Sequence, residues 1–216
     1  MENGDRLTRA EFERRYEAMP NLKKAELIEG VVYVPSPVRL AQHGRPNQDI
    51  DAWLGVYRAG TPGLTGATNA TVRLDLDNEP QPDAMLLLES DGQSRVGPDG
   101  YVEGAPELIV EIAASSVSYD LHAKLVVYRR SGVSEYIVWR VLDNAIDWFV
   151  LTEGEYVRAE PDSSGTCRSQ IFPGLWLNVP AMLAGDLSGV LRTLQSGLDS
   201  AEHSNFVGSI GQATIQ

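Results

Sequence analysis

One short apolar segment with a single acid inside it constrains the fold more than any other part of the chain. Residues Leu108–Ala113 read LIVEIA, a continuous apolar run that only Glu111 interrupts. A second run, Asp83–Leu88 (DAMLLL), carries an acid at its first position alone. Runs of this length are typical of strands that other elements cover on both faces. The chain is therefore expected to fold around a buried sheet flanked by helices.

The segments around these two runs predict a mixed α/β domain. Apolar residues at helical spacing predict helices over residues 8–19, 47–57, 117–130 and near 185–197. Alternating or continuous apolar runs predict strands over residues 25–34, 70–76, 83–88, 108–113, 135–141, 146–151 and 155–160, with a hairpin turn at Asp143-Asn144. Residues 1–197 are expected to form a single domain. Residues 198–216 are expected to form a polar, loosely ordered C-terminal tail.

The composition excludes several classes of protein. A single cysteine, Cys167, excludes a disulfide framework and a metal site built from several thiolates. The longest uninterrupted apolar run, Ala84–Leu88, is far shorter than the roughly 20 residues that a membrane-spanning helix needs. The first residues contain no apolar stretch of the signal-peptide type. We therefore expect a soluble, cytoplasmic protein that makes no membrane contact.

The charge balance bears on possible partners. The formal net charge of −12 at pH 7 argues against a protein that simply coats nucleic acid, because phosphate contacts need a basic surface. Between residues 75 and 111, Arg95 is the single basic residue among ten acids, so this segment would repel a polyanion unless cations intervene. The chain has only three lysines, Lys23, Lys24 and Lys124. Each lysine is of interest because lysine, unlike arginine, can shift its pKa when buried.

Asp83 and Glu111 are acids in or at the start of predicted core strands. Side chains alternate along a strand, so Glu111 shares its face with Ile109 and Ala113. A carboxylate in such surroundings is costly to bury unless it is paired or binds a cation. Oxygen ligands of this kind favour Mg²⁺ or Mn²⁺ over Zn²⁺. A structural ion pair is the alternative interpretation of each acid.

Lys124 is predicted to border the buried face of the helix at 117–130. It lies between Leu121 and Tyr128, which belong to the apolar stripe of that helix, and Asp120 lies one turn before it. An ammonium near two carboxylates can orient a water molecule or stabilise a developing negative charge. A structural pair with Asp120 or Glu111 is again the alternative.

The order of these motifs resembles the PD-(D/E)XK nuclease superfamily. Pro82-Asp83 is followed on the next core strand by Glu111-Ile112-Ala113 and then by a helix. Several flanking segments resemble its Uma-two endonuclease-like family in particular. They are Glu26-Leu27-Ile28-Glu29-Gly30, the Pro-Ser-Pro at 35–37 with His43, residues 106–111, Asp120 with Lys124, residues 132–136 and residues 172–175. Together they span residues 7–183 in the expected order.

This resemblance implies a restriction-endonuclease-like fold and Mg²⁺-dependent cleavage of phosphodiester bonds, with Mn²⁺ able to substitute. Asp83 and Glu111 would hold the metal together with the backbone carbonyl of Ile112, and Lys124 would act as the catalytic lysine. The chain departs from the usual pattern, because the lysine of the superfamily usually follows the glutamate by two residues and Ala113 stands there. A lysine moved to the following helix is a known variation.

Two further residues and the partners are implied less directly. Glu26 matches an acid that completes the metal site in some relatives, and a solvated glutamate on an edge strand is the alternative. His43 is expected to support the site or the fold. The resemblance implies DNA as partner and a homodimer. Two alternatives of other classes stay open: a non-catalytic interaction module that retains the fold, and a metal-dependent phosphoesterase for small phosphates.

Overall fold

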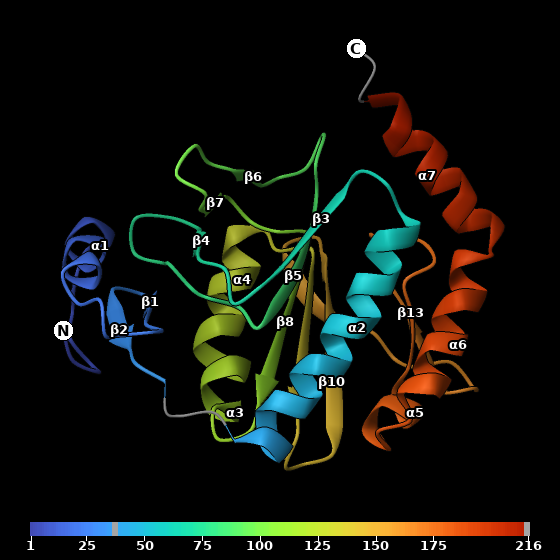
Figure 1. Cartoon of the computed structure of the whole chain (residues 1–216), viewed down its shortest axis with the longest axis horizontal. Coiled ribbons are helices and arrows are strands. Elements are labelled where there is room, and N and C mark those ends of the chain that lie inside the picture. The colour runs from blue at the N-terminus through green and yellow to red at the C-terminus, as the bar shows by residue number, and fades with distance from the viewer. Residues whose placement is uncertain (36–38, 214–216) are drawn as a thin grey trace.

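A six-stranded sheet forms the centre of the protein, whose computed structural model describes residues 1–35 and 39–213, with side chains up to residue 210 (Figure 1). The strands lie in the order β11-β10-β9-β8-β5-β3. Their bounds are β3 Leu64–Thr68, β5 Ala84–Leu88, β8 Leu108–Ala113, β9 Glu135–Arg140, β10 Ala145–Thr152 and β11 Glu155–Arg158. Strands β8 and β9 run parallel, and the other neighbours run antiparallel. The predicted mixed α/β fold is thereby confirmed.

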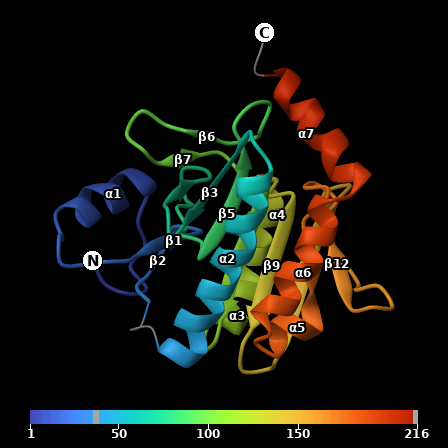
Figure 2. The same cartoon turned by 45° about the vertical axis from the view of Figure 1, so that its right-hand side comes forward.

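Alternation along the central strands creates two apolar layers, one on each face of the sheet. Leu108, Val110 and Ile112 of β8 belong to the layer that also contains residues of α2 (Arg45–Gly60), α5 (Val179–Leu183) and α6 (Leu187–Leu198). Ile109 and Ala113 belong to the other layer, which contains residues of α4 (Leu125–Ser131). Figure 2 shows α2 and α6 crossing in front of the strands. The core strands are therefore covered on both faces, as the sequence predicts.

The crossover between β8 and β9 is a continuous helical segment of three parts. It consists of α3 (Val117–Tyr119), a π-helical turn η2 (Asp120–Lys124) and α4. Gly132 ends it in the left-handed region, at φ 89°, where a residue without a side chain is least strained. The helix predicted over residues 117–130 is confirmed, and its π-helical turn was not foreseen. Such turns occur often at functional sites.

The N-terminal residues form a small layer of their own beside the sheet, at the left of Figure 1. Helix α1 (Arg9–Glu17) packs on the hairpin of β1 (Glu26–Ile28) and β2 (Val31–Tyr33) through a cluster that includes Phe12 and Leu27. Backbone hydrogen bonds in both directions between Leu27 and Glu79 join the hairpin to the rest of the protein. The predicted helix and strands are confirmed here. Ser36 and Pro37 of the Pro-Ser-Pro motif lie outside the described residues.

Two smaller sheets complete the fold. They consist of β4 (Val72–Arg73), β7 (Val102–Glu103) and β6 (Arg95–Val96), and of β12 (Thr166–Arg168) with β13 (Trp176–Asn178). The strand predicted over residues 70–76 is wrong in length. A turn ends it early, because the backbone N–H groups of Leu74 and Asp75 donate to the carbonyl of Asn78. Alternation alone cannot detect such a turn.

The C-terminal residues are the main correction to the expected fold. Instead of a loosely ordered tail, residues 201–213 form helix α7 (Ala201–Ala213), at the right of Figure 1. His203 is buried and its Nε2 lies 2.9 Å from Oγ1 of Thr61, while the ring of Phe206 packs edge-on against Phe172. These contacts hold α7 against the core. In the described part of the chain, no helix is both long and apolar enough to cross a membrane.

Candidate active site

Asp83 and Glu111 lie beside each other where the pairing of β5 with β8 ends. Ala84 of β5 is paired with Val110 of β8, so each acid lies one residue beyond this pair in an antiparallel arrangement. Each acid is 3% exposed. The backbone N–H of Ile112 donates to Oδ2 of Asp83 at 2.8 Å, which joins the two strands at this point. The fold therefore brings both predicted acids and the backbone of Ile112 into one place.

Lys124 lies against Glu111 and joins it to Glu26. Its Nζ donates to Oε1 of Glu111 at 2.8 Å and to Oε1 of Glu26 at 2.9 Å, and lies 3.8 Å from Oδ1 of Asp120. The hydroxyl of Tyr128 also donates to Oε1 of Glu111, at 2.8 Å. All these side chains are buried. One ammonium thus faces three carboxylates in an environment with little water, so the cluster carries an excess of negative charge.

The excess of negative charge in the cluster affects the pKa values of its side chains. Burial disfavours the charged form of Lys124, but the carboxylates of Glu111, Glu26 and Asp120 outweigh it and raise the pKa of Lys124 well above its usual value. Burial raises the pKa of Glu111 too, and Lys124 offsets only part of that rise because Asp83, Asp120 and Glu26 add to it. An added cation would relieve this repulsion.

Asp83 has a histidine and a lysine as partners of its own. His43, in the π-helical turn η1 (Leu40–Gly44) before α2, places Nε2 3.2 Å from Oδ2 of Asp83. Lys24 places Nζ 3.4 Å from Oδ1 of Asp83 and donates to Oδ1 of Asn69 at 3.0 Å. Burial alone would raise the pKa of Asp83, but the hydrogen bond with His43 and the charge of Lys24 lower it to about 2. Asp83 is therefore ionised at neutral pH.

Glu26 is not the solvated edge residue that the alternative interpretation describes. It is 5% exposed, and its Oε1 accepts from the backbone N–H of Gln81 at 2.8 Å as well as from Lys124. The hydrogen bonds between Leu27 and Glu79 bring β1 to this position. The alternative is wrong because it treated β1 as a free edge of the fold.

Two residues of the cluster were not foreseen as such. The sequence distinguishes Lys24 only by the rarity of lysine. Lys24 nevertheless precedes Glu26 by two residues, so the two side chains lie on the same side of an extended chain. Tyr119 has its ring 5.2 Å from Nζ of Lys124 and packs on Tyr33 at 4.2 Å between ring centres. Its hydroxyl is buried and has no hydrogen-bond partner among the described residues. No sequence signal marked Tyr119.

The oxygen ligands of this site are of the kind that binds a hard cation, although these side chains do not converge on one point. Across the described ranges, no three His, Cys, Asp or Glu side chains converge as they would around a metal ion. The acids instead form two groups, Asp83 with its own cations and Glu111 with Glu26 around Lys124. Carboxylate and hydroxyl oxygens are nevertheless the ligands that Mg²⁺ takes. The metal-binding roles of Asp83, Glu111, Glu26 and Ile112 therefore stay predictions.

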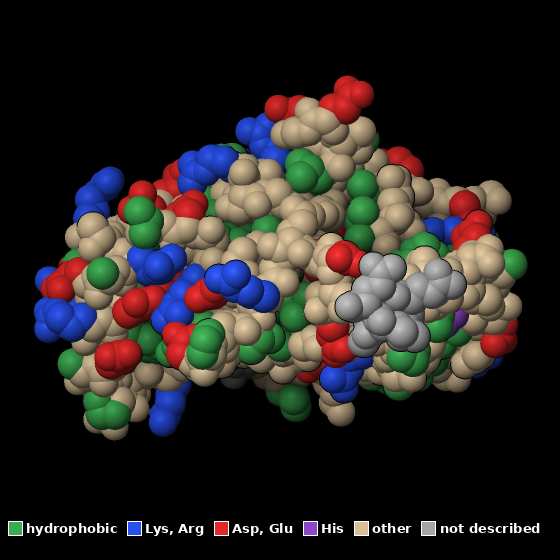
Figure 3. All heavy atoms as spheres, turned by 90° about the horizontal axis from the view of Figure 1, so that it is seen from above, with side chains coloured by type: hydrophobic (Ala, Val, Ile, Leu, Met, Phe, Trp, Pro, Cys, Tyr) green, Lys and Arg blue, Asp and Glu red, His purple; other side chains and the backbone are tan. Residues whose placement is uncertain are grey.

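On the face of the molecule in Figure 3, the described residues form no large basic area that would offset the acidity of the cluster. Figure 3 shows one face of the molecule, on which basic and acidic side chains are interspersed. Several surface arginines are engaged in ion pairs, such as Arg14 with Glu11 and Arg95 with Glu103. Electrostatic attraction of a polyanion would thus depend on a few local cations.

The mixed sheet and its flanking helices define a class, that of proteins with a nuclease-like fold. The fold is similar to that of a solved structure from Anabaena variabilis ATCC 29413, described as "a putative nuclease belonging to DUF820". The TM-score is 0.52 at 14% sequence identity, over 81% of this chain and 90% of that chain. This similarity confirms the predicted nuclease-like fold.

The family follows from the sequence of residues 9–180, which matches the family model "Uma2: Putative restriction endonuclease". The chain belongs to the Uma2 family, and the resemblance found in its motifs is confirmed. No curated protein matches the chain in sequence.

Proposed function

We propose that the protein is a Mg²⁺-dependent endonuclease that hydrolyses phosphodiester bonds of DNA. The observation that carries the proposal is the buried contact of Lys124 with Glu111 and Glu26 beside Asp83. Charged side chains seldom lie in a core unless they are paired or bind a metal ion. The family description and the nuclease fold support the class of reaction. A homodimer, which the resemblance to the family implies, belongs to the proposal.

Each residue has a distinct part in this proposal. Asp83, Glu111, Glu26 and the carbonyl of Ile112 would hold the metal ion. When bound, Mg²⁺ would polarise the phosphoryl oxygens and lower the pKa of a water molecule. Lys124 orients the attacking water and stabilises the negative charge that develops on the phosphate.

The remaining neighbours keep these groups in position. Tyr128 donates to Glu111, which fixes the direction of that carboxylate. His43 and Lys24 contact opposite oxygens of Asp83 and keep it ionised. These are positioning residues, since in the proposal they act through the acid that they contact.

A non-catalytic interaction module is the second candidate. It is favoured by the pairing of every acid with a protein cation, Lys124 for Glu111 and Glu26, and Lys24 with His43 for Asp83. Such a cluster can persist without a metal. The net charge of −12 also keeps open a phosphoesterase for small phosphates, for which an acidic surface is less of an obstacle.

The deciding experiment compares the wild type with Glu111→Gln on supercoiled plasmid and single-stranded DNA, with Mg²⁺, Mn²⁺ or EDTA. A matched control is Glu135→Gln, since Glu135 is an equally buried glutamate on the neighbouring strand and contacts none of the site residues named above. We expect metal-dependent nicking by the wild type and by Glu135→Gln, and none by Glu111→Gln. Cleavage that persists in Glu111→Gln would remove this acid from the reaction.

The same assay separates the alternatives. No cleavage of DNA by any variant, with metal still bound, would favour the interaction module. Metal-dependent hydrolysis of a small phosphodiester such as bis-p-nitrophenyl phosphate, without cleavage of DNA, would favour the phosphoesterase.

A further inference from the structure

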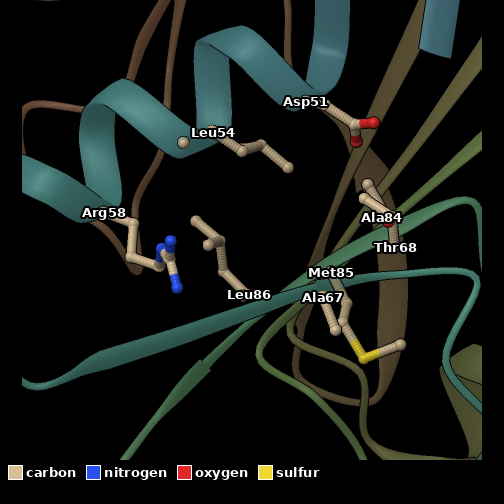
Figure 4. Close-up of a pocket in the computed structure, with 10 residues that line it drawn as sticks. Asp51, Leu54, Arg58, Ala67, Thr68, Ala84, Met85 and Leu86 are labelled. Atoms are coloured by element: carbon tan, nitrogen blue, oxygen red, sulfur yellow. The ribbon is translucent and has the colours of Figure 1, made fainter. Parts of the chain in front are cut away.

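A cavity of about 260 Å³ lies between α2 and the strands β3 and β5 at the edge of the sheet (Figure 4). Its α2 wall is one stripe of the helix, in which residues three or four positions apart face the same way. The stripe consists of Asp51, Leu54, Gly55 and Arg58. The opposite wall consists of Gly66, Ala67, Thr68, Ala84, Met85 and Leu86. None of these residues belongs to the acid–lysine cluster.

The two ends of the cavity differ in charge. Figure 4 shows Asp51 near Thr68 and Ala84 at one end, and Arg58 near Leu86 at the other. Asp51 and Arg58 are seven positions apart in the helix, which corresponds to about 10 Å along the helix axis. The side chain of Leu54 lies between them. The cavity therefore has an acceptor end, an apolar middle and a cationic end.

The polar groups at both ends are free to bind something else. Oδ2 of Asp51 accepts from Nδ2 of Asn47 at 2.8 Å, but Oδ1 is buried and has no hydrogen-bond partner among the described residues. Among the described residues, no acid forms an ion pair with Arg58. A buried oxygen without a donor is costly, so a ligand that supplies an N–H or O–H would stabilise it.

Two glycines on opposite walls keep the cavity open. Gly55 lies in the interior of α2, where glycine is less favourable than alanine, and an added Cβ there would meet no atom within 4 Å. On β3, a Cβ at Gly66 would lie 3.1 Å from Cδ2 of Leu86 and 3.5 Å from Cδ of Arg58. The second of these distances also shows that the Arg58 side chain reaches across to β3. Larger residues at either position would reduce the space.

The acceptor end of the cavity adjoins the acid–lysine cluster. Thr68 is paired with Ala84, the residue after Asp83. The next residue, Asn69, accepts a hydrogen bond from Lys24, which contacts Asp83. Burial and the nearby charge of Asp83 raise the pKa of Asp51, which agrees with this proximity. Lys24 therefore lies near the acceptor end of the cavity, without lining it, and Arg58 lines the opposite end.

We infer that this cavity holds one nucleoside of the substrate, next to the phosphodiester that is cleaved. Its two phosphates would contact Lys24 and Arg58, and a base N–H would donate to Asp51. This inference rests on the proposed function and specifies its substrate. A base enclosed by protein cannot remain stacked and paired in a duplex. The preferred substrate is therefore single-stranded or otherwise unpaired nucleic acid.

The test measures binding of a fluorescently labelled single-stranded dodecamer and of its duplex by anisotropy. All proteins carry Glu111→Gln to prevent cleavage, and each is measured with Mg²⁺ and with EDTA. We expect the single strand to bind roughly tenfold or more tightly than the duplex. Gly55→Leu fills the cavity and Arg58→Ala removes its cation, and each should weaken binding of the single strand by roughly tenfold or more.

Matched controls separate loss of the cavity from loss of the fold. Val56→Leu places a leucine at the next position of α2, which is exposed and does not line the cavity. Arg192→Ala removes an exposed arginine of α6. Both should bind the single strand as the parent does. Gly55→Leu should unfold at or above the midpoint of the parent, since leucine favours the helix. An excess of a nucleoside monophosphate should compete, and inorganic phosphate at the same concentration should not.

The outcomes of this test and of the plasmid assay are separable. Parent-like binding by a folded Gly55→Leu protein, or equal binding of single strand and duplex, would overturn the cavity inference even where the plasmid is nicked. An absence of binding in both buffers would overturn it as well. Preferential single-strand binding that Gly55→Leu removes would sustain it as a binding site even if no cleavage is found.

Discussion

Glu111 and Glu135 are both buried glutamates on neighbouring parallel strands, yet they have partners of different kinds. Glu135 begins β9, and its two oxygens accept from the hydroxyl of Ser169 and from the backbone N–H of Gln170, each at 2.7 Å. Glu111 accepts from Lys124 and from Tyr128, which reach it from the crossover helix. One acid is held by neutral groups of a nearby loop, and the other belongs to a group of charges.

The pKa values alone would not distinguish the two. Burial raises the pKa of Glu135 to about 7, against the lowering effect of its hydrogen bonds, and burial raises the pKa of Glu111 as well. The two glutamates differ in the hydrogen-bond partners of their carboxylates. The neutral donors of Glu135 anchor residues 169–172 to the sheet, so that acid is structural. A buried acid becomes a candidate for chemistry when its partners are charged side chains that a ligand can displace.

The largest effect in this comparison should follow from removing the cation of the charged group. Lys124→Met leaves Glu111 and Glu26 facing each other without their ammonium, and breaking a buried pair in this way costs about 3–5 kcal/mol. Urea unfolding would measure the loss. The double variant Glu26→Gln/Lys124→Met should recover part of it, because one of the two facing charges is gone. A loss below about 1 kcal/mol, typical of exposed pairs, would contradict the buried charges described here.

Local patterns predicted most of the central sheet and two of its acids. LIVEIA and DAMLLL are strands covered on both faces, and helical phase alone indicated that Lys124 borders the core. These features depend on residues that are near each other in the chain. Alternation also predicted correctly that Glu111 lies on the face that Ile109 and Ala113 share.

The partners of these residues could not be predicted in the same way. Lys24 lies 59 positions from Asp83, and Lys124 lies 98 positions from Glu26, so their contacts depend on how distant segments pack. No local periodicity encodes such a contact. Helix α7 was missed for a related reason, since its contacts with the core are made by distant segments, as in the contact of His203 with Thr61 and of Phe206 with Phe172.

The raised pKa of Glu135 should make stability depend on pH by about 3 kcal/mol. Its pKa is about 7 in the folded protein against 4.5 as its ordinary value, and each pKa unit corresponds to about 1.4 kcal/mol. A raised carboxyl pKa means that the folded state binds the proton more tightly. The stabilisation is therefore full below about pH 4.5 and is lost as the pH rises to about 7.

The measurement for this prediction is the free energy of unfolding of the wild type and of Glu135→Gln between pH 4 and pH 8. The wild type should lose stability relative to the variant as the pH rises, because glutamine stays neutral. A constant difference between the two curves would show that Glu135 has the same pKa in both states.

The affinity for a metal ion should also depend on Glu111 and not on Glu135. Titration calorimetry with Mn²⁺ should give a binding signal for the wild type and for Glu135→Gln. Asp83→Ala and Glu111→Gln should each weaken Mn²⁺ binding by roughly a hundredfold, which is about 2.7 kcal/mol. Lys124→Met should still bind Mn²⁺ but lose turnover. If the wild type and Glu111→Gln give the same titration curve, there is no metal site at Glu111.

The smallest effect is expected at the loop that Glu135 anchors. The hydroxyl of Ser169 donates to Glu135 and accepts from the backbone N–H groups of Ile171 at 3.2 Å and Phe172 at 2.7 Å, so Ser169→Ala removes three hydrogen bonds at once. We expect a loss of about 1–2 kcal/mol in urea unfolding and no change in plasmid nicking. Ser196→Ala is the control, since the hydroxyl of Ser196 is exposed and contacts only the helix backbone. Reduced nicking by a fully folded Ser169→Ala protein would connect this loop to the acid–lysine cluster, and the distinction between a structural and a chemical glutamate would then fail.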